Sequence, residues 1–349
     1  MTADESTATA GDEGATTRDA TDGPKPNRAP PRSVTAVVLT HMRPRLAGEV
    51  TRSLLEVEGF APDRVVVVVN GVGGLDDPEL EARVRMVRLP VNLGPAGGFR
   101  AGLLEAFSDP DTRWAYLCED DVSLFALPAP RLGALVERVE GLGSGDPEGR
   151  PVGAVVAYGR RFVGRGTHTV NVVPEAGAPS DLTQVDVACW GATLVSRAVA
   201  DAEVLPDAEW FFGLEDFDFF CRVREAGFDV LVDDVAARQV AEQQTDEGRE
   251  RALQERRPTD GSEAWRRYYH SRNSLALVRR HGRPSWYVWQ AAYSARHLQR
   301  AAGRDERAAI VHGLWDGLLG RMGENPRYAR SVGEFSPAAE PGDSEPGPR

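Results

Sequence analysis

The sequence is short of cysteine, of long apolar runs and of positive charge, and each shortage excludes a class of protein. Its three cysteines (Cys118, Cys189 and Cys221) lack CxxC spacing, which excludes a disulfide framework or zinc knuckle and fits a reducing cytoplasm. No stretch approaches the roughly 18 apolar residues of a membrane span, and the N-terminal segment lacks the basic start and apolar run of a secretory signal. A net charge of −12 argues against a nucleic-acid partner. We therefore expect a cytoplasmic location.

The composition that remains, 41 % hydrophobic and 27 % charged residues, is that of an ordinary soluble globular protein. Residues 1–32 and 331–349 are rich in small, polar and proline residues without apolar periodicity. Such segments cannot bury enough surface to offset their ordering entropy, so both are predicted to be disordered tails. We expect a main domain over 33–255 and a helical extension over 256–330.

Short apolar strands alternate with amphipathic helices in the first half of the chain. Val34–Thr40 and Val65–Val69 flank a predicted helix, which is typical of a βαβ unit in a parallel sheet. The second half is mixed, so the expected class is α/β with parallel pairing first and α+β additions later. Further predicted elements are strands at Val84–Leu89, Trp114–Leu117, Val152–Tyr158, Val185–Trp190 and Thr193–Ser196, helices at Ala96–Phe107 and Asp216–Ala226, and helical structure after Ser262.

Three acids, Glu119, Asp120 and Asp121, directly follow a predicted strand. Ligands of open α/β sheets bind at the carboxyl ends of strands, and adjacent carboxylates repel unless a cation or hydrogen bonds neutralise them. A divalent ion bridging a diphosphate would do so. A solvated turn whose acids cap the next segment is an equally favoured interpretation.

A glycine-rich segment from Asn92 to Gly102 opens a predicted helix. Glycines let the backbone approach a ligand, and free N–H groups at a helix start suit an anion or a sugar. Gly102 also allows close packing of the helix on the sheet. The alternative is a tight strand-to-helix turn with no ligand.

Acids stand among aromatic residues between Trp210 and Arg222, where desolvation is expected to raise a carboxylate pKa. Helical spacing allows Asp218 to pair with Arg222. Asp216 points elsewhere and is free to face a cleft, where it could accept a proton from a hydroxyl nucleophile. A capped helix with a structural ion pair would explain Asp218 and Arg222 but not Asp216.

Arginines alternate with aromatic residues late in the chain. Arg272, within Tyr268–Asn273, could bind a phosphate, although such residues are more often helix surface and core. The segments Trp265–Tyr269 and Trp286–Trp289 have the composition of interfacial helices. Packing on the protein core is the favoured alternative, and weak peripheral contact with the inner membrane face is the other.

Taken together and in this order, the motifs resemble the family 2 glycosyltransferases, most closely the galactofuranosyl- and rhamnosyltransferase branch. The motifs that carry the resemblance are Val34–Pro44, Val65–Gly71, Asn92–Phe99, Glu119–Asp121, Glu215–Arg222 and Tyr268–Asn273. The resemblance implies a GT-A fold, with a mixed, mainly parallel sheet flanked by helices. It also implies inverting transfer from a UDP- or dTDP-sugar, for example of galactofuranose or rhamnose, to a hydroxyl of a glycan or lipid-linked glycan.

The resemblance also implies roles for particular residues. Asp121 and Glu119 would bind Mg²⁺ or Mn²⁺, and Asp216, with Glu215, would act as the catalytic base. Trp190 and Trp210 would contact the acceptor. The implied donor-binding residues are Thr40, Arg43, Asn70, Asn92, Gly97, Gly98, Asp120 and Arg272.

The chain departs from the family pattern in places. Val69 and Glu119 each replace an aspartate, and Ala236–Glu242 lacks a metal-binding histidine, for which Gln239 or Glu242 could substitute. A non-catalytic, degenerate domain that binds a nucleotide sugar or glycan is therefore the main alternative. A nucleotidyltransferase is disfavoured because Lys25, in the predicted tail, is the only lysine.

Overall fold

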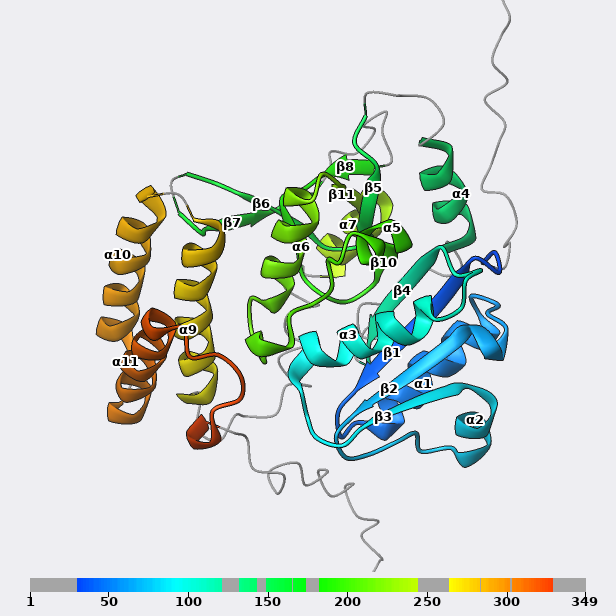
Figure 1. The fold of residues 1–349 in the computed structure, drawn as a ribbon, viewed down its shortest axis with the longest axis horizontal. Helices are drawn as coiled ribbons and strands as arrows, with labels where there is room; N and C mark the ends of the chain where they lie inside the picture. The colour runs from blue at the N-terminus through cyan, green and yellow to red at the C-terminus, as the bar shows by residue number, and fades with distance from the viewer. Residues whose placement is uncertain are drawn as a thin grey trace, which may run out of the picture.

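A computed structural model describes most of the chain between residues 30 and 328 (Figure 1). The described ranges are 30–120, 132–142, 149–164, 166–173, 182–243, 264–282, 284–301 and 303–328. Apart from residues 30–32, both predicted tails lie outside these ranges.

The main sheet has eight strands in the order β3-β2-β1-β4-β10-β5-β11-β8. β2, β1 and β4 are parallel neighbours, whereas β10 runs antiparallel between β4 and β5. This mixed, mainly parallel sheet confirms the predicted α/β, GT-A-like class. The strands are β1 (Val34–Thr40), β2 (Val65–Asn70), β3 (Arg85–Leu89), β4 (Trp114–Glu119), β5 (Val152–Val156), β8 (Leu182–Gln184), β10 (Thr193–Ser196) and β11 (Asp229–Asp233).

Helices cover both faces of this sheet, which explains why β1 and β2 are buried along their whole length. Side chains alternate across a strand. One set from β1 packs with α3, around Phe99, and the other packs with α1, around Val50. The helices of this part are α1 (Pro44–Glu56), α2 (Pro78–Arg83), α3 (Gly94–Phe107), α4 (Leu132–Leu142), α5 (Arg197–Asp201), α6 (Glu215–Glu225) and α7 (Asp234–Gln243).

Gly102 confirms the predicted close approach of α3 to the sheet. A Cβ at this position would lie 2.3 Å from Cγ1 of Val37 on β1. Any larger residue would force the helix away from the strand.

The predicted strand at Val185–Trp190 is shorter in the structure. Only Val187–Ala188 (β9) is extended, and it pairs with β6 (Gly159–Phe162). β7 (Thr169–Asn171) completes this small second sheet on the other side of β6.

The helical extension consists of α9 (Ala264–His281), α10 (Pro284–Arg300) and α11 (Arg304–Leu319), which stand side by side in Figure 1. Glycines bring α11 against α9: Cβ atoms at Gly313 and Gly317 would lie 2.3 and 2.6 Å from the carbonyl oxygens of Tyr268 and Arg272. Among the described residues, no helix combines the length and apolar character needed to cross a membrane.

Candidate active site

A cavity of about 230 Å³ opens where β1, β2 and β4 end. The first turn of α3, the loop before α6 and the start of α9 complete its wall, so both halves of the chain contribute. Its lining residues are Leu39, His41, Met42, Arg43, Asn70, Asn92, Gly94, Pro95, Glu119, Asp120, Phe211, Phe212, Trp265, Arg266, Glu324 and Tyr328.

Thr40, Arg43 and Asp120, all predicted to contact the donor, contact one another; Arg43 and Asp120 line the cavity, whereas Thr40 does not. The Thr40 hydroxyl donates to Oδ2 of Asp120 (2.9 Å), and Arg43 Nη1 donates to Oδ1 (2.8 Å). Both oxygens of this buried carboxylate are therefore engaged. Asp120 orients the Arg43 guanidinium, which lies on the cavity wall where a phosphate could bind.

Asn70 and Asn92 line the cavity and also shape the turn before α3. The Asn70 amide donates to the carbonyl of Gly94 (2.9 Å) and accepts from Leu93 N–H (2.8 Å), and Asn92 Oδ1 accepts from Gly94 N–H (2.9 Å). Gly94 has φ +70°, and a Cβ there would lie 1.7 Å from the carbonyl oxygen of Phe211. Only glycine permits this approach of the α3 turn to the loop before α6.

Gly97 and Gly98, predicted to contact the donor, are not among the cavity-lining residues. Both are buried, and added Cβ atoms would lie 2.4 Å from Leu93 and 2.3 Å from Leu39. Close helix packing, rather than access to a ligand, explains these two glycines.

The acid pair at the start of α6 has strongly perturbed protonation. Burial, reinforced by the charge of Asp216, raises the pKa of Glu215 well above its usual range. Burial also raises the pKa of Asp216 to about 6, although the Phe217 N–H (2.8 Å) and the Cys189 thiol both stabilise its charged form. Burial therefore favours the neutral form of Glu215, whereas half-buried Asp216, with a pKa of about 6, is mostly ionised at neutral pH and able to accept a proton.

Glu119 connects this acid pair to the cavity. It ends β4, lines the cavity, and its charge contributes to the raised pKa values of Glu215 and Cys189. A charge on the wall of the strand-end cavity therefore affects the protonation of Glu215, in the acid pair at the start of α6.

The predicted metal site falls partly outside the described residues, because Asp121 lies there. Within the described ranges, no group of three or more His, Cys, Asp and Glu side chains could hold a metal ion. Gln239 and Glu242 belong to α7, but their side chains lie outside the described part of the chain.

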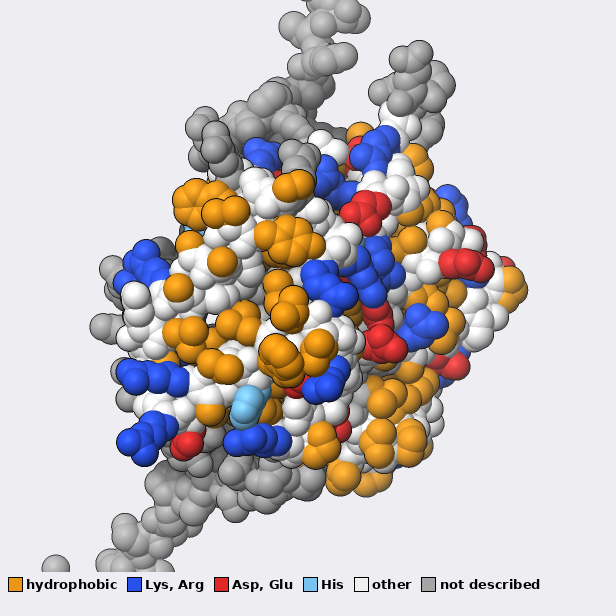
Figure 2. Space-filling model, turned by 60° about the vertical axis from the view of Figure 1, so that its left-hand side comes forward, with side chains coloured by type: hydrophobic (Ala, Val, Ile, Leu, Met, Phe, Trp, Pro, Cys, Tyr) orange, Lys and Arg blue, Asp and Glu red, His pale blue; other side chains and the backbone are white. Residues whose placement is uncertain are grey.

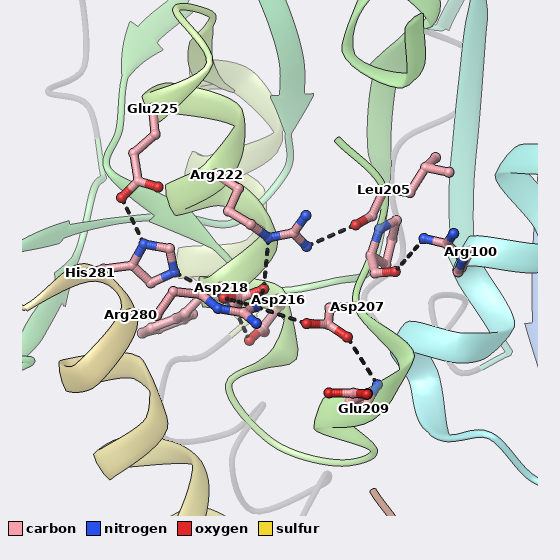
Figure 3. Close-up of polar contacts among 12 residues, drawn as sticks. Arg100, Leu205, Asp207, Glu209, Asp216, Asp218, Arg222, Glu225, Arg280 and His281 are labelled. Carbon is pink, nitrogen blue, oxygen red and sulfur yellow. Dashed lines mark hydrogen bonds and ion pairs between the residues drawn. The ribbon is translucent and has the colours of Figure 1, made fainter. Parts of the chain in front are cut away.

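The predicted pair of Asp218 with Arg222 is confirmed, at 2.9 Å, and belongs to a larger network (Figure 3). Arg280 and His281, at the end of α9, also reach the fully buried Asp218, at 3.0 and 2.9 Å. Burial alone would raise the pKa of Asp218, but the His281 hydrogen bond and the two arginine charges lower it. His281 further contacts Glu225 (2.7 Å). This network fixes α9 to α6.

Arg272 does not line the cavity, in contrast to its predicted donor contact. It is completely buried, donates to the carbonyls of Trp210 (2.7 Å) and Gly323, and lies under the Tyr269 ring. Asn273 donates to the Phe212 carbonyl (2.8 Å) as well. These two residues hold the loop before α6, so they position the acid pair without reaching a ligand.

Trp190 and Trp210 are core residues, in positions that do not fit the predicted stacking on an acceptor sugar. Trp190 is 6 % exposed and packs on Phe99 and Phe219, with ring centroids 4.9 and 5.4 Å apart. Trp210 is 1 % exposed beneath Arg280.

Several cavity residues escaped the sequence analysis, among them His41 and the Phe212–Trp265 pair, whose rings lie 4.7 Å apart. His41 Nδ1 lies 2.7 Å from the Asn70 carbonyl oxygen. The position of His41 directly after β1 could have marked it. The segment Trp265–Tyr269 is predicted to be interfacial or core, and nothing local in the sequence marks Trp265, Arg266 or Tyr328 as cavity residues, because only the packing of the C-terminal helices brings them there.

No protein-family model matches the sequence, and no curated protein matches it. Among solved structures, the chain is similar to GalNAc-T7 with UDP, GalNAc and Mn²⁺ (11 % identity, TM-score 0.40), over 58 % of this chain and 41 % of that one. It is also similar to 4-diphosphocytidyl-2C-methyl-D-erythritol synthase from Anaerococcus prevotii (12 % identity, TM-score 0.32), over 57 % of this chain and 85 % of that one. This chain thus spans about two fifths of the length of GalNAc-T7. At such identities and scores, neither likeness identifies a substrate.

Proposed function

We propose that the chain is an inverting glycosyltransferase that uses a UDP- or dTDP-sugar as donor, for example of galactofuranose or rhamnose, and a hydroxyl of a glycan or lipid-linked glycan as acceptor. The observation that carries the proposal is Asp216, a half-buried carboxylate with a pKa of about 6. Such a group is tuned to accept a proton near neutral pH. Asp216 is not among the cavity-lining residues, but its neighbour Glu215 is influenced by the charge of Glu119, which does line the cavity.

In the proposed reaction, Asp216 takes the proton of the acceptor hydroxyl while that oxygen attacks the anomeric carbon. The bond from that carbon to the nucleoside diphosphate breaks, and the configuration inverts. Burial and the neighbouring charge of Asp216 both favour the neutral form of Glu215, which limits the negative charge beside the base. Arg43 and Arg266 line the cavity and provide positive charge for the diphosphate.

A divalent ion, Mg²⁺ or Mn²⁺, would offset the charge of the departing diphosphate. Glu119 fits as a ligand because it lines the cavity, and Asp121 follows it by two residues. Asp120 does not fit, since Thr40 and Arg43 occupy both its oxygens. Mg²⁺ in phosphate sites takes one or two protein carboxylates in addition to phosphate oxygens, which agrees with this small set.

Calorimetry of UDP and dTDP binding, with and without Mn²⁺, tests the donor site. We expect one nucleotide to bind in a metal-dependent way, and expect Glu119→Gln and Asp121→Ala to remove the dependence. Asp111→Asn, an exposed acid away from the cavity, is the matched control. Failure of both nucleotides to bind the wild-type protein would refute the proposal.

Transfer itself is tested with Asp216→Asn, which we expect to bind nucleotide normally but to lose turnover. Nucleotide binding without turnover in the wild type, across candidate sugars and acceptors, would instead support the non-catalytic alternative. Pyrophosphate release from a nucleoside triphosphate would identify a nucleotidyltransferase.

A further inference from the structure

The helix α10 buries polar residues and exposes apolar ones, the reverse of a helix in an ordinary globular protein. Its two buried residues are Gln290 and Ser294, which are polar, whereas Val288 and Trp289 are 71 and 54 % exposed. An amphipathic helix normally buries its apolar stripe against the core. The apolar side of α10 therefore faces away from the protein.

The neighbouring helix α11 buries Ala309, Ile310, Gly313 and Gly317 but also leaves large apolar residues exposed. Val311, Trp315 and Leu318 are more than half exposed. These three residues are spaced four and three apart, so they form one stripe. Because a large exposed apolar surface marks an interaction site, both stripes require a partner.

We define the α10–α11 face as the exposed apolar residues of α10 (Val288, Trp289 and Tyr293), the stripe on α11, and the exposed arginines that continue them. On α10, Trp289 and Tyr293 are followed at helical spacing by Arg296 and Arg300. On α11, Arg304 and Arg307 precede the apolar stripe. Figure 2 shows apolar side chains gathered on this side of the molecule, with basic side chains at the edges and few acids.

We propose that the α10–α11 face binds the surface of a bilayer that contains anionic phospholipids. Tryptophan and tyrosine favour the headgroup level of a membrane, and arginines beside them pair with lipid phosphates while their stems stay in apolar surroundings. Charge complementarity supports this partner. The face carries four exposed arginines (Arg296, Arg300, Arg304 and Arg307) against two acids in the first turn of α11 (Asp305 and Glu306). Residues 264–328 as a whole hold twelve arginines and four acids, although the whole chain carries −12.

The same charge disfavours a second copy of the chain as the occupant. In a symmetric dimer the same patch meets itself, so the arginines of both copies would be brought together. Like charges across an interface are costly. An anionic lipid surface, in contrast, is attracted by about 1 kcal/mol for each arginine near it.

The proposed membrane-binding face differs in position from the interfacial segments that the sequence suggested. Tyr268 and Tyr269 are buried in the core, and Trp286 packs on Phe162 with ring centroids 5.0 Å apart. Of the tryptophans in the two suggested segments, Trp289 is the one that is more than half exposed, and the α11 stripe was not anticipated. The proposal does not rest on the proposed enzymatic function, because lipid binding requires no sugar donor.

Flotation of the full chain with lipid vesicles tests the proposal. Vesicles of phosphatidylcholine alone are compared with vesicles that contain phosphatidylglycerol, at low salt and at about 1 M salt, where screening is strong. We expect binding to the anionic vesicles at low salt, weakened about fivefold for each arginine removed in Arg296→Gln with Arg300→Gln. Trp289→Gln with Trp315→Gln should weaken binding tenfold or more.

The matched control is Leu104→Gln with Leu142→Gln, which changes two apolar residues of similar exposure (53 and 49 %) on α3 and α4. It should bind vesicles like the wild type, and circular dichroism melting should show all variants folded. Absence of vesicle binding by the wild type, or equal loss in the control, would overturn the proposal. So would a concentration-dependent dimer in light scattering that the tryptophan variant abolishes without any vesicle binding.

Discussion

The pKa of Asp216 leads to a quantitative prediction for the pH dependence of sugar transfer. If Asp216 is the base, kcat/KM must fall as its carboxylate becomes protonated, so the acidic limb should have its midpoint near the raised pKa of about 6. Near pH 5, only about one tenth of the enzyme would hold the ionised base. A carboxylate with the usual pKa of 3.8 would still be more than nine tenths ionised there.

The structure also indicates a substitution that should shift the midpoint of the acidic limb. The Cys189 thiol hydrogen-bonds to Asp216 and stabilises its charged form, so Cys189→Ala should raise the pKa of Asp216 and shift the limb upward by up to about one pH unit. Cys221→Ala is the matched control, because this buried thiol also lies on α6, but its pKa is raised by burial and by the carboxylates of Glu225, Asp218 and Asp186. Asp216→Asn should reduce kcat about a thousandfold.

The assay is release of UDP or dTDP from the sugar donor, followed between about pH 4.5 and 8.5. A limb near pH 4 would mean that Asp216 is not desolvated in the working enzyme. A limb near 6 that Cys221→Ala moves and Cys189→Ala does not, or full activity in Asp216→Asn, would refute the assignment of the base.

Two further predictions concern the contacts that hold α6. Asp218→Ala should destabilise the protein by about 3 kcal/mol in denaturant unfolding, because it removes a fully buried partner of Arg222, Arg280 and His281. The exposed partner of His281 offers the control: Glu225→Ala should cost less than about 1 kcal/mol. The lowered pKa of Asp218 stabilises the fold above pH 3.8, and the raised pKa of His281 stabilises it below pH 6.5. The stability lost on Asp218→Ala should therefore be largest between these pH values and shrink outside them. A stability loss that is independent of pH would contradict the ionic account. Arg272→Lys should lower kcat more than nucleotide affinity, since a lysine cannot reach the carbonyls of both Trp210 and Gly323. An unchanged kcat would contradict the positioning role.

The parts of the fold that follow local rules could be predicted from the sequence. Continuous apolar runs at β1 and β2 indicate strands covered on both faces, and the structure buries every residue of both. Gly102 could be assigned to close packing because a glycine within a helix that covers a sheet allows the two to approach. The pair of Asp218 with Arg222 follows from helical spacing alone.

Residues whose roles depend on distant packing could not be predicted. A glycine-rich turn has the same sequence signature whether it cradles a ligand or a neighbouring side chain, and at Gly97 and Gly98 the neighbour is protein. Arg272 has the chemistry of a phosphate ligand, but α11 and the loop before α6 enclose it. The sequence indicates the chemistry available at a position, whereas burial decides its use.

The C-terminal helices are needed to complete the site. Arg280 and His281 neutralise Asp218 one turn into α6, and Arg272 and Asn273 hold the loop that precedes it. Without α9, a buried carboxylate would lose two of its three cationic partners, which is strongly unfavourable, and the loop would lose its anchors. We infer that the acid pair at the start of α6 keeps its position only while α9 is packed against it, so the helices that carry the proposed membrane face also support the proposed base.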